Sequence, residues 1–575
     1  MDVSSYTYHH PVGWDTPFTP LTLPAMFAAS ARERGDAPLL HFMGRAYGYH
    51  ALFQDAERFA SQLIERGIGR GDRVGLFLPN VPIYVAAYYG AMMAGAVVVN
   101  FSPLYTVEEL AAQVEDSGTR LLVTIDVPEL YGTACKVLRQ SSLETLVVGE
   151  LSAMLPWAKG AAMKLLARSK IARVDYGPDT LRWAQFMQDA NWSRWLDGRL
   201  QTGPAIAPDD LALLQYTGGT TGRPKGAMLS HANLSVNAQQ VASINPFGNP
   251  HDEVFMGALP MFHVFANTAL LNHAVASGGS IAIVPRFEAK QVLKTIDGMA
   301  ATGFPGVPTM FQALLDHADL DSTDLTSLKV CISGGAPLPA PVREQWESRT
   351  GARLVEGYGL TESSGVVSVN PYSGVRKPGT IGQVVPQTLV RLVDKEDPTK
   401  PVADGEAGEL VVAGPQIMQG YWNRPDTDAR TFVEMDGRRW LRTGDVAEID
   451  RDGFISIVDR IKDMIAVGGF KVFPSEVEKV VLHHPAIKEA LVLGLPDSYR
   501  GESVNAFVTI LPGVDITGDE LREWANDRLG KHERLAALHI RQELPKTMIG
   551  KLDRKALRAE IQGEETAAGT DRSDS

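Results

Sequence analysis

The chain has 575 residues, more than one hydrophobic core usually supports, so we expect at least two domains. Lysine and arginine number 55 against 68 aspartates and glutamates, and the net charge of −13 argues against nucleic acid as a partner. Only Cys135 and Cys331 are present, so neither a disulfide framework nor a zinc site is indicated.

The first residues show neither the basic start nor the apolar core of an export signal, so we expect a cytoplasmic protein. The uncharged run 81–99 approaches the length of a membrane span. A proline and two glycines interrupt this run. We therefore interpret it as a buried helix over 83–94, followed by a buried strand over 96–100.

Helices and strands alternate in the first part of the chain. Apolar residues at helical spacing predict a helix over 53–65, and short apolar runs predict strands over 74–78 and 121–125. Thr106 and Glu109 form a capping box that predicts a helix start. This alternation predicts a parallel sheet with helices on both faces.

Residues 151–174 form a basic segment, because five lysines and arginines occur there without an acidic residue, interleaved with Met154, Trp157, Leu165 and Leu166. A basic amphipathic helix with an aromatic anchor can lie on a membrane surface. Solvated charges over an ordinary core face explain the pattern equally simply. Peripheral contact with the inner membrane is thus one of two interpretations that stay open.

A strand predicted over 211–216 runs into a loop of glycines, threonines and one lysine. The glycines let the backbone approach an anion, while the hydroxyls and the ammonium add donors and charge. Pro224 before the lysine and Gly226 after it depart from the common nucleotide loop of kinases and GTPases. We expect a polyphosphate to bind Thr217, Gly218, Gly219, Thr220, Thr221, Gly222 and Lys225.

Three later segments carry further candidate site residues. Residues 330–336 repeat the order of strand then glycine, which lets a flat ligand rest against the backbone, and 356–362 add an aromatic ring, a hydroxyl and a carboxylate. A histidine lies among apolar and aromatic residues in 259–265. The candidates are His263, Gly334, Gly335, Ala336, Gly357, Tyr358, Thr361 and Glu362.

From 380 to 457 short strands alternate with Gly and Asp turns, which predicts a β-rich subdomain. Asp445 and Arg460 supply groups that can bind ribose hydroxyls. Beyond Lys462 we predict a helix from 474 to about 483 within a compact α+β tail, and Lys551 lies in a loop near its end.

Taken together and in this order, these segments resemble the superfamily of acyl- and aryl-CoA ligases, nonribosomal adenylation domains and luciferases. Among its members the chain looks most similar to bacterial long-chain fatty-acid CoA ligases. The resemblance implies an α/β fold: a large N-terminal domain of parallel sheets with helices over 1–460, including a β-rich subdomain at about 380–460. A small mobile C-terminal α+β domain over 463–562 would follow a hinge at Lys462, with 563–575 as a disordered tail.

The resemblance also implies a reaction in two halves. A carboxylate attacks the α-phosphate of MgATP to give an acyl-adenylate and pyrophosphate, and the thiol of coenzyme A then displaces AMP. We therefore expect Mg²⁺ as cofactor, ATP and coenzyme A as co-substrates, and a medium- to long-chain fatty acid. An aryl- or dicarboxylic acid:CoA ligase, an acyl-AMP ligase loading a carrier protein, and a non-catalytic nucleotide- or lipid-binding protein are the alternatives.

Residue roles follow from the same resemblance. The loop from Thr217 to Lys225 would hold the β- and γ-phosphates, Thr361 would contact the α-phosphate, and Glu362 would hold Mg²⁺. Tyr358 would stack on adenine beside the backbone of Gly334, Gly335 and Ala336, Gly357 would also bind the nucleotide, and Asp445 with Arg460 would fix the ribose. Lys551 would neutralise charge developing on the α-phosphate.

For the second half, the small domain would swing about Lys462 and bring Gly468, Gly469 and Lys471 to the pantetheine channel. His263 would orient or gate the acyl chain. Val264, Phe265 and Ala266 follow it where several long-chain enzymes have a tryptophan, and Arg442 stands where histidine is frequent. The tunnel gate, the chain length, the pathway and the oligomeric state stay open, and a homodimer is compatible with the sequence.

Overall fold

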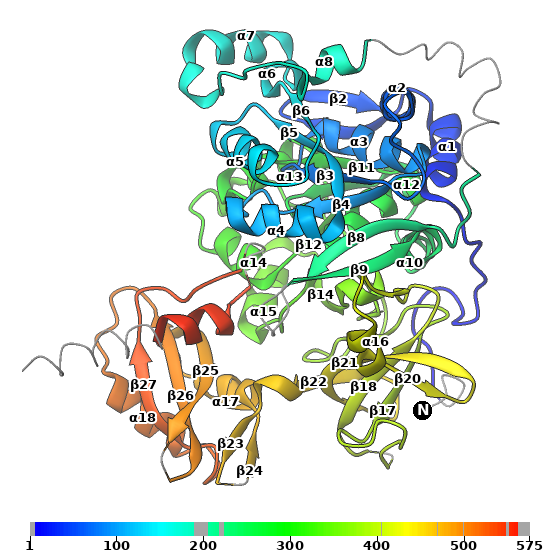
Figure 1. Cartoon of the computed structure of the whole chain (residues 1–575). Coiled ribbons are helices and arrows are strands. Elements are labelled where there is room, and N and C mark those ends of the chain that lie inside the picture. Colours follow the sequence, from blue (N-terminus) through cyan, green and yellow to red (C-terminus); the bar gives the residue numbers. More distant parts are fainter. Residues whose placement is uncertain are drawn as a thin grey trace, which may run out of the picture. The chain divides into compact units, whose positions relative to one another are not determined.

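The computed structural model describes residues 6–188, 205–217, 224–403, 405–468, 470–497, 499–547 and 551–561 (Figure 1). The chain divides into two compact units. The larger unit consists of Thr7–Leu389 and Ala413–Phe432, and the smaller unit of Met1–Tyr6, Val390–Val412 and Val433–Ser575. The boundary expected at Lys462 stays a prediction, and the tail expected over 563–575 lies outside the described residues.

The first sheet of the larger unit is parallel through its middle and antiparallel at both edges. Its strands follow in the order β16 (Gln383–Val384), β15 (Ser368–Val369), β14 (Arg353–Tyr358), β13 (Val330–Gly334), β12 (Gly303–Gly306), β10 (Val254–Gly257), β11 (Ser280–Ile283), β1 (Pro38–Phe42) and β2 (Arg45–Gly48).

The second sheet has the same design, with parallel strands in its middle and an antiparallel edge. Its order is β19 (Gly420–Tyr421), β9 (Lys225–Ser230), β8 (Leu211–Thr217), β4 (Val97–Phe101), β3 (Arg73–Phe77), β5 (Thr119–Ile125), β6 (Thr145–Gly149) and β7 (Thr180–Arg182).

Helices pack around these sheets (Figure 1). They are α1 (Leu23–Arg34), α2 (Tyr49–Glu65), α3 (Pro82–Met93), α4 (Val107–Ser117), α5 (Pro128–Gln140), α6 (Leu151–Met154), α7 (Trp157–Leu166), α8 (Trp183–Phe186), α10 (His231–Ser243), α11 (Val264–Ala266), α12 (His273–Ser277), α13 (Ala289–Met299), α14 (Pro308–Leu315), α15 (Ala340–Thr350) and α16 (Pro425–Thr431). A π-helix, Asn267–Asn272, joins α11 to α12.

The smaller unit contains two sheets. One has the order β17 (Leu389–Val393), β18 (Gly408–Ala413), β21 (Arg438–Ile449) and β20 (Phe432–Met435), with β22 (Ile455–Arg460) paired to β21. The other has the order β24 (Phe470–Val472), β23 (Ile465–Val467), β26 (Gly501–Ile510) and β25 (Ile487–Asp497), with β27 (Leu535–Ile540) paired to β26. Helices α17 (Pro474–Leu482) and α18 (Gly518–Asn526) bury Val477 and Leu521 in its core.

The structure confirms the predicted α/β class and the elements expected from periodicity. Thr106 and Glu109 form the capping box of α4, and α2, α3 and α17 lie within a few residues of their predicted bounds. Every residue of α3 is buried, so the uncharged run is a core helix, as interpreted from its glycines and proline. Within the described part of the chain, the search for a helix with the length and hydropathy of a membrane span found none.

Candidate functional site

The glycine- and threonine-rich loop joins β8 to β9, and both of its ends are held together. Thr217 pairs with Lys225 in the antiparallel ladder, and Thr217 Oγ1 donates a hydrogen bond to the Lys225 carbonyl over 3.5 Å. Gly218, Gly219, Thr220, Thr221 and Gly222 lie outside the described residues. Pairing with Thr217 nevertheless fixes the position of Lys225, the first residue of β9.

Tyr421 connects this lysine to the candidate metal carboxylate. The ammonium of Lys225 lies 5.3 Å from the centroid of the Tyr421 ring, a cation–π distance. The Tyr421 hydroxyl donates a hydrogen bond of 2.5 Å to Glu362 Oε1. Burial and the neighbouring Glu362 carboxylate raise the pKa of Tyr421, so its hydroxyl keeps the proton that it donates. One side chain thus positions a cation and an anion of the site.

The local fold explains why Tyr421 reaches both groups. Strand β19 pairs with β9, which sets Tyr421 opposite Ala227, and the Trp422 amide donates to the Gly226 carbonyl at 2.8 Å. The Met418 amide donates to the Glu362 carbonyl at 2.9 Å. Backbone hydrogen bonds therefore hold the 418–422 segment against both partners of its tyrosine.

Glu362 fits a metal that also binds a polyphosphate. Thr361 and Glu362 belong to one turn of 3-10 helix, Thr361–Ser363, and both are half-buried. Oε1 of Glu362 is held by Tyr421, whereas Oε2 has no hydrogen-bond partner among the described residues. Nor do those residues contain a group of three or more His, Cys, Asp or Glu side chains that could hold a metal unaided. A single carboxylate is the donor set that Mg²⁺ uses beside substrate phosphates.

A second group of candidate residues lies where β13 and β14 end side by side. Their parallel register sets Gly334 opposite Gly357, and Tyr358 is the last residue of β14. Gly334 packs closely against α11, because a Cβ at this position would lie 2.9 Å from the ring of Phe265. Gly335 and Ala336 follow directly and are not buried. The register therefore brings Gly334, Gly357 and Tyr358 to one edge of the sheet, and their role in binding adenine stays a prediction.

His263 begins α11 as its N-cap residue. Its Nδ1 accepts a hydrogen bond of 3.3 Å from the Phe265 amide, so in the neutral ring the proton lies on Nε2. The turn after Glu362 packs against the same region, since Thr268 Oγ1 donates to the Ser364 carbonyl at 2.5 Å. His263, Phe265 and Glu362 thus belong to connected segments of the larger unit.

The loop that leads to His263 depends on a buried asparagine which the sequence analysis missed. Asn80 Nδ2 donates to the carbonyls of Gly257 and Leu259 at 3.2 and 2.9 Å, and Asn80 Oδ1 accepts from the Met261 amide at 2.7 Å. Its place three residues after the end of β3 was an available signal, because polar residues at the carboxyl ends of parallel strands serve sites.

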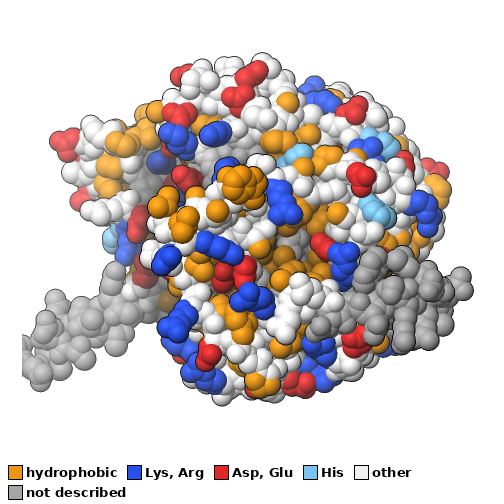
Figure 2. All heavy atoms as spheres, turned by 90° about the horizontal axis from the view of Figure 1, so that it is seen from above, with side chains coloured by type: hydrophobic (Ala, Val, Ile, Leu, Met, Phe, Trp, Pro, Cys, Tyr) orange, Lys and Arg blue, Asp and Glu red, His pale blue; other side chains and the backbone are white. Residues whose placement is uncertain are grey.

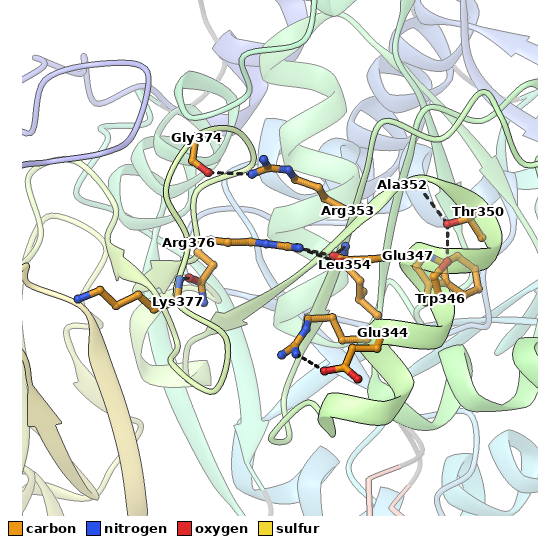
Figure 3. Close-up of polar contacts among 12 residues, drawn as sticks. Glu344, Trp346, Glu347, Thr350, Ala352, Arg353, Leu354, Gly374, Arg376 and Lys377 are labelled. Carbon is orange, nitrogen blue, oxygen red and sulfur yellow. Dashed lines mark hydrogen bonds and ion pairs between the residues drawn. The ribbon is translucent and has the colours of Figure 1, made fainter.

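Figure 3 shows how β14 and the loop between β15 and β16 are fastened to each other and to α15. Glu347 of α15 accepts a hydrogen bond of 2.7 Å from Arg376 Nη2 and one of 2.8 Å from the Leu354 amide. Arg353 Nη1 donates to the Gly374 carbonyl at 3.1 Å. Burial acts to raise the pKa of Glu347, but the ion pair with Arg376 and the Leu354 amide outweigh it and lower the pKa. These contacts hold the strand that ends in Tyr358.

In the smaller unit, the structure joins the two residues predicted to bind ribose. Asp445 and Arg460 are opposite each other in the β21–β22 ladder, and Arg460 Nε donates to Asp445 Oδ1 at 3.0 Å. Lys551 lies in their electrostatic field. Burial and, to a smaller extent, the Arg460 guanidinium lower the pKa of Lys551 to about 8, although the Asp445 carboxylate acts in the opposite direction.

Arg442, which departs from the family pattern, has a structural partner. It pairs with the buried carboxylate of Glu409 on β18, with Nη2 and Nε at 2.7 and 3.0 Å from Oε2. The other oxygen of Glu409 accepts from the Gly444 amide at 3.2 Å. This pair therefore holds the irregular part of β21 that precedes Asp445.

The residues flanking Lys462 are tied to the C-terminal elements. Asp459 accepts a hydrogen bond of 2.7 Å from the Ser475 amide at the start of α17, and Asp463 lies 3.9 Å from Arg554. Lys462 itself lies in the single 3-10 turn Ile461–Asp463 between these anchors. Whether this turn acts as a hinge stays a prediction.

The proposed coenzyme A residues are only partly described. Gly468 has a positive φ of 57° at the end of β23, and Lys471 of β24 makes a long ion pair of 3.9 Å with Glu396. Gly469 lies outside the described residues. Their role in binding coenzyme A stays a prediction.

Comparisons with known proteins agree with this arrangement. Residues 27–422 match the family described as AMP-binding enzyme, and residues 476–551 match the AMP-binding enzyme C-terminal domain. A long-chain-fatty-acid–CoA ligase of Bacillus subtilis is 38% identical over 551 residues, which cover 96% of each chain. One of Salmonella typhimurium is 37% identical and covers 94% of this chain and 95% of its own.

Solved structures give the same result. ATP-bound MatB from Rhodopseudomonas palustris superposes with a TM-score of 0.78 at 28% identity, covering 94% of this chain and 99% of that one. The anthranilate CoA ligase AuaEII in complex with anthranoyl-AMP has a TM-score of 0.81 at 24% identity, over 96% of this chain and 100% of its own. The latter likeness concerns the fold alone. The resemblance inferred from the motifs is confirmed.

Proposed function

The chain belongs to the AMP-binding enzyme family, and from that premise we propose that it is an ATP-dependent fatty acid:CoA ligase for medium- to long-chain acids. The acid is first coupled to AMP, with release of pyrophosphate, and the acyl group then passes to the thiol of coenzyme A with release of AMP. The names of the two bacterial relatives, which cover nearly the whole chain, support a fatty acid as the substrate.

The observation that carries the proposal is the placement of Lys225 and Glu362 around one tyrosine. A polyphosphate with its metal needs a cation for its oxygens and a carboxylate for the ion, held at fixed positions. The ring of Tyr421 supports the Lys225 ammonium and its hydroxyl holds Glu362 Oε1. We assign Thr217 and Lys225, with the loop between them, to the β- and γ-phosphates, and Thr361 to the α-phosphate.

Mg²⁺ is the proposed cofactor. Glu362 would hold it through the oxygen that Tyr421 leaves open, together with oxygens of ATP. When bound, the ion would offset the negative charge of the phosphates. The chain's own contribution is the orientation of this carboxylate.

Asp445, Arg460 and Lys551 form the second half of the proposal. Asp445 would accept hydrogen bonds from the ribose hydroxyls, with Arg460 fixing its carboxylate at 3.0 Å. In its protonated form Lys551 would donate to the α-phosphate as the carboxylate of the substrate attacks. Its lowered pKa makes this protonation sensitive to pH around 8.

The remaining roles are proposed on the family resemblance. Tyr358 would stack on adenine against the Gly334 and Gly357 backbone, which the strand register already brings side by side. His263 would orient the acyl chain near the thiol. The 463–562 region would rotate about Lys462 between the two half-reactions, with Gly468, Gly469 and Lys471 then serving coenzyme A.

Separate assays of the two half-reactions test this assignment. Lys551→Ala should slow acid-dependent exchange of pyrophosphate into ATP about 10²- to 10³-fold, because one stabilising donor of the transition state is lost. Thioester formation from supplied acyl-adenylate and coenzyme A should change little. Lys546→Ala is the matched control, since Lys546 pairs with Glu489 at 2.6 Å in the same unit. Equal loss in both half-reactions would contradict the role of Lys551.

A further inference from the structure

Helix α7 turns its apolar side chains toward solvent. Trp157 and Leu166 are each 87% exposed and Leu165 is 67% exposed, whereas the buried residue of this helix is Gly160. Spacings of one, four and five residues place the exposed apolar positions on one helical face. This outer stripe consists of Trp157, Ala158, Ala161, Ala162, Leu165 and Leu166. Of the two interpretations of the basic segment, an ordinary core face does not describe α7.

Tight packing on the opposite side of the helix fixes this orientation. A Cβ at Gly160 would lie 2.3 Å from the Ser152 carbonyl oxygen of α6, so any larger residue would push the two helices apart. Lys159 Nζ donates to the Met43 carbonyl at 2.7 Å. The stripe therefore faces outward because α7 docks through its glycine side.

Cations surround the outer stripe. Lys164, Arg168, Lys170 and Arg173 are all exposed at the end of α7 and in the turn that follows it. A hollow of about 400 Å³ beside the helix is lined by four basic side chains, those of Lys164, Arg168, Arg173 and Arg182, against the two carboxylates of Asp126 and Glu150. Figure 2, which views the chain from above Figure 1, shows hydrophobic and basic side chains side by side on this face.

We propose that the outer stripe and its cations dock on the surface of an anionic lipid bilayer. An exposed tryptophan and leucines on one helical face can enter the boundary between headgroups and acyl chains, while the flanking lysines and arginines meet lipid phosphates. The chain as a whole carries a net charge of −13, so a bilayer of like charge repels most of it. The local basic face therefore meets the anionic bilayer, its apolar centre can enter it, and together they set the orientation of docking.

The proposal is independent of the ligase activity, because it concerns a helix that supplies none of the proposed site residues. Flotation of the full-length protein with vesicles tests it. The native chain should float with phosphatidylcholine vesicles that contain phosphatidylglycerol and remain unbound with phosphatidylcholine alone. Lys164→Glu/Arg168→Glu should weaken binding at least about 25-fold, since each cation near such a surface contributes about fivefold.

The apolar part has its own variant and controls. Leu165→Ser/Leu166→Ser should also lose binding, whereas Leu104→Ser, at a position 68% exposed elsewhere in the larger unit, should not. Lys531→Glu/Arg534→Glu, on exposed residues of the smaller unit, imposes the same change in net charge as the α7 pair and should bind as the native chain does. Circular dichroism confirms that each variant is folded.

Two results would overturn the proposal. One is equal flotation of the native chain and both α7 variants. The other is that the native protein forms a dimer without lipid, and that Leu165→Ser/Leu166→Ser converts it to a monomer but leaves flotation unchanged. The outer stripe would then be an interface between two copies of the chain.

Discussion

At the scale of single residues, Tyr421 is the most informative position of the candidate site. It lies 59 positions from Glu362 in sequence, and its ring and hydroxyl serve two different charged partners. The tyrosine thus converts two separate side chains into one preorganised pair. Preorganisation matters because a donor or ligand already in place needs no rearrangement as charge develops.

Replacement of Tyr421 by Phe separates its two functions. The ring under Lys225 remains, but the hydrogen bond to the Glu362 carboxylate is lost, which costs about 1.5–3 kcal/mol for a charged partner. We expect adenylation to slow about tenfold or more and to need more Mg²⁺ for half-maximal rate. Pyrophosphate exchange over a Mg²⁺ titration measures both effects.

Tyr47→Phe is the control for this variant, because its hydroxyl donates to the Met154 carbonyl away from these residues. If Tyr421→Phe matched the native protein in rate and in Mg²⁺ dependence, the tyrosine would have no part in positioning the carboxylate.

The pKa of Lys551, lowered to about 8 mainly by burial, predicts a pH dependence. The protonated amine is the form that can neutralise phosphate charge, so activity is present below this pKa and is lost as pH rises through it. The quantity to measure is kcat/KM for ATP in adenylation, because it reports ionisations of the free enzyme. It should fall above about pH 8 in the native protein.

Lys551→Arg tests the assignment of that decline. A guanidinium stays charged throughout this pH range, so whatever activity the variant retains should no longer fall above pH 8. The same decline in Lys551→Arg would assign it to another group.

At the scale of elements, the site depends on how strands are fastened to their neighbours. Strand β14 carries Gly357 and Tyr358, and α15 holds its beginning through Glu347, which also pairs with Arg376. Asn80 likewise holds the loop before His263, because it accepts a hydrogen bond from the Met261 amide. These polar side chains position the site although none of them belongs to it.

Glu347→Gln should lower the free energy of unfolding by about 1–3 kcal/mol at neutral pH, because Arg376 loses its charged partner. In the folded state the pKa of Glu347 lies below its ordinary value of 4.5. The ionised carboxylate therefore stabilises the fold fully above pH 4.5, and this stabilisation disappears as the pH falls through the lower pKa of the folded state. Urea unfolding at pH 7 and at about pH 3 measures the difference between variant and native protein. A difference that persisted in acid would show that the ion pair is not its source.

Much of the molecule could be predicted at the level of its elements. Long apolar or periodic runs, such as α2, α3 and β4, are specified by local pattern, and the structure has them close to their predicted bounds. Partnerships across the chain could not be predicted, because nothing local to Gly420–Tyr421 or Asn80 indicates which strand or loop each will meet. The basic segment shows a different limit: its periodicity defines a helical face but not whether that face points inward or outward.

At the scale of the whole molecule, the chain has two compact units that each hold part of the proposed chemistry. The larger contains Lys225, Glu362 and Tyr358, and the smaller contains Asp445, Arg460 and Lys551. The central claim is that the first half-reaction needs residues of both units. It predicts that removing a residue of either unit impairs the same first half-reaction.

The most direct test offers purified protein a panel of carboxylic acids with ATP and Mg²⁺, with and without coenzyme A. We predict release of pyrophosphate that depends on a medium- or long-chain fatty acid, AMP as the nucleotide product, and an acyl-CoA of the matching mass only when coenzyme A is present. Absence of acid-dependent ATP cleavage across the panel would contradict the account.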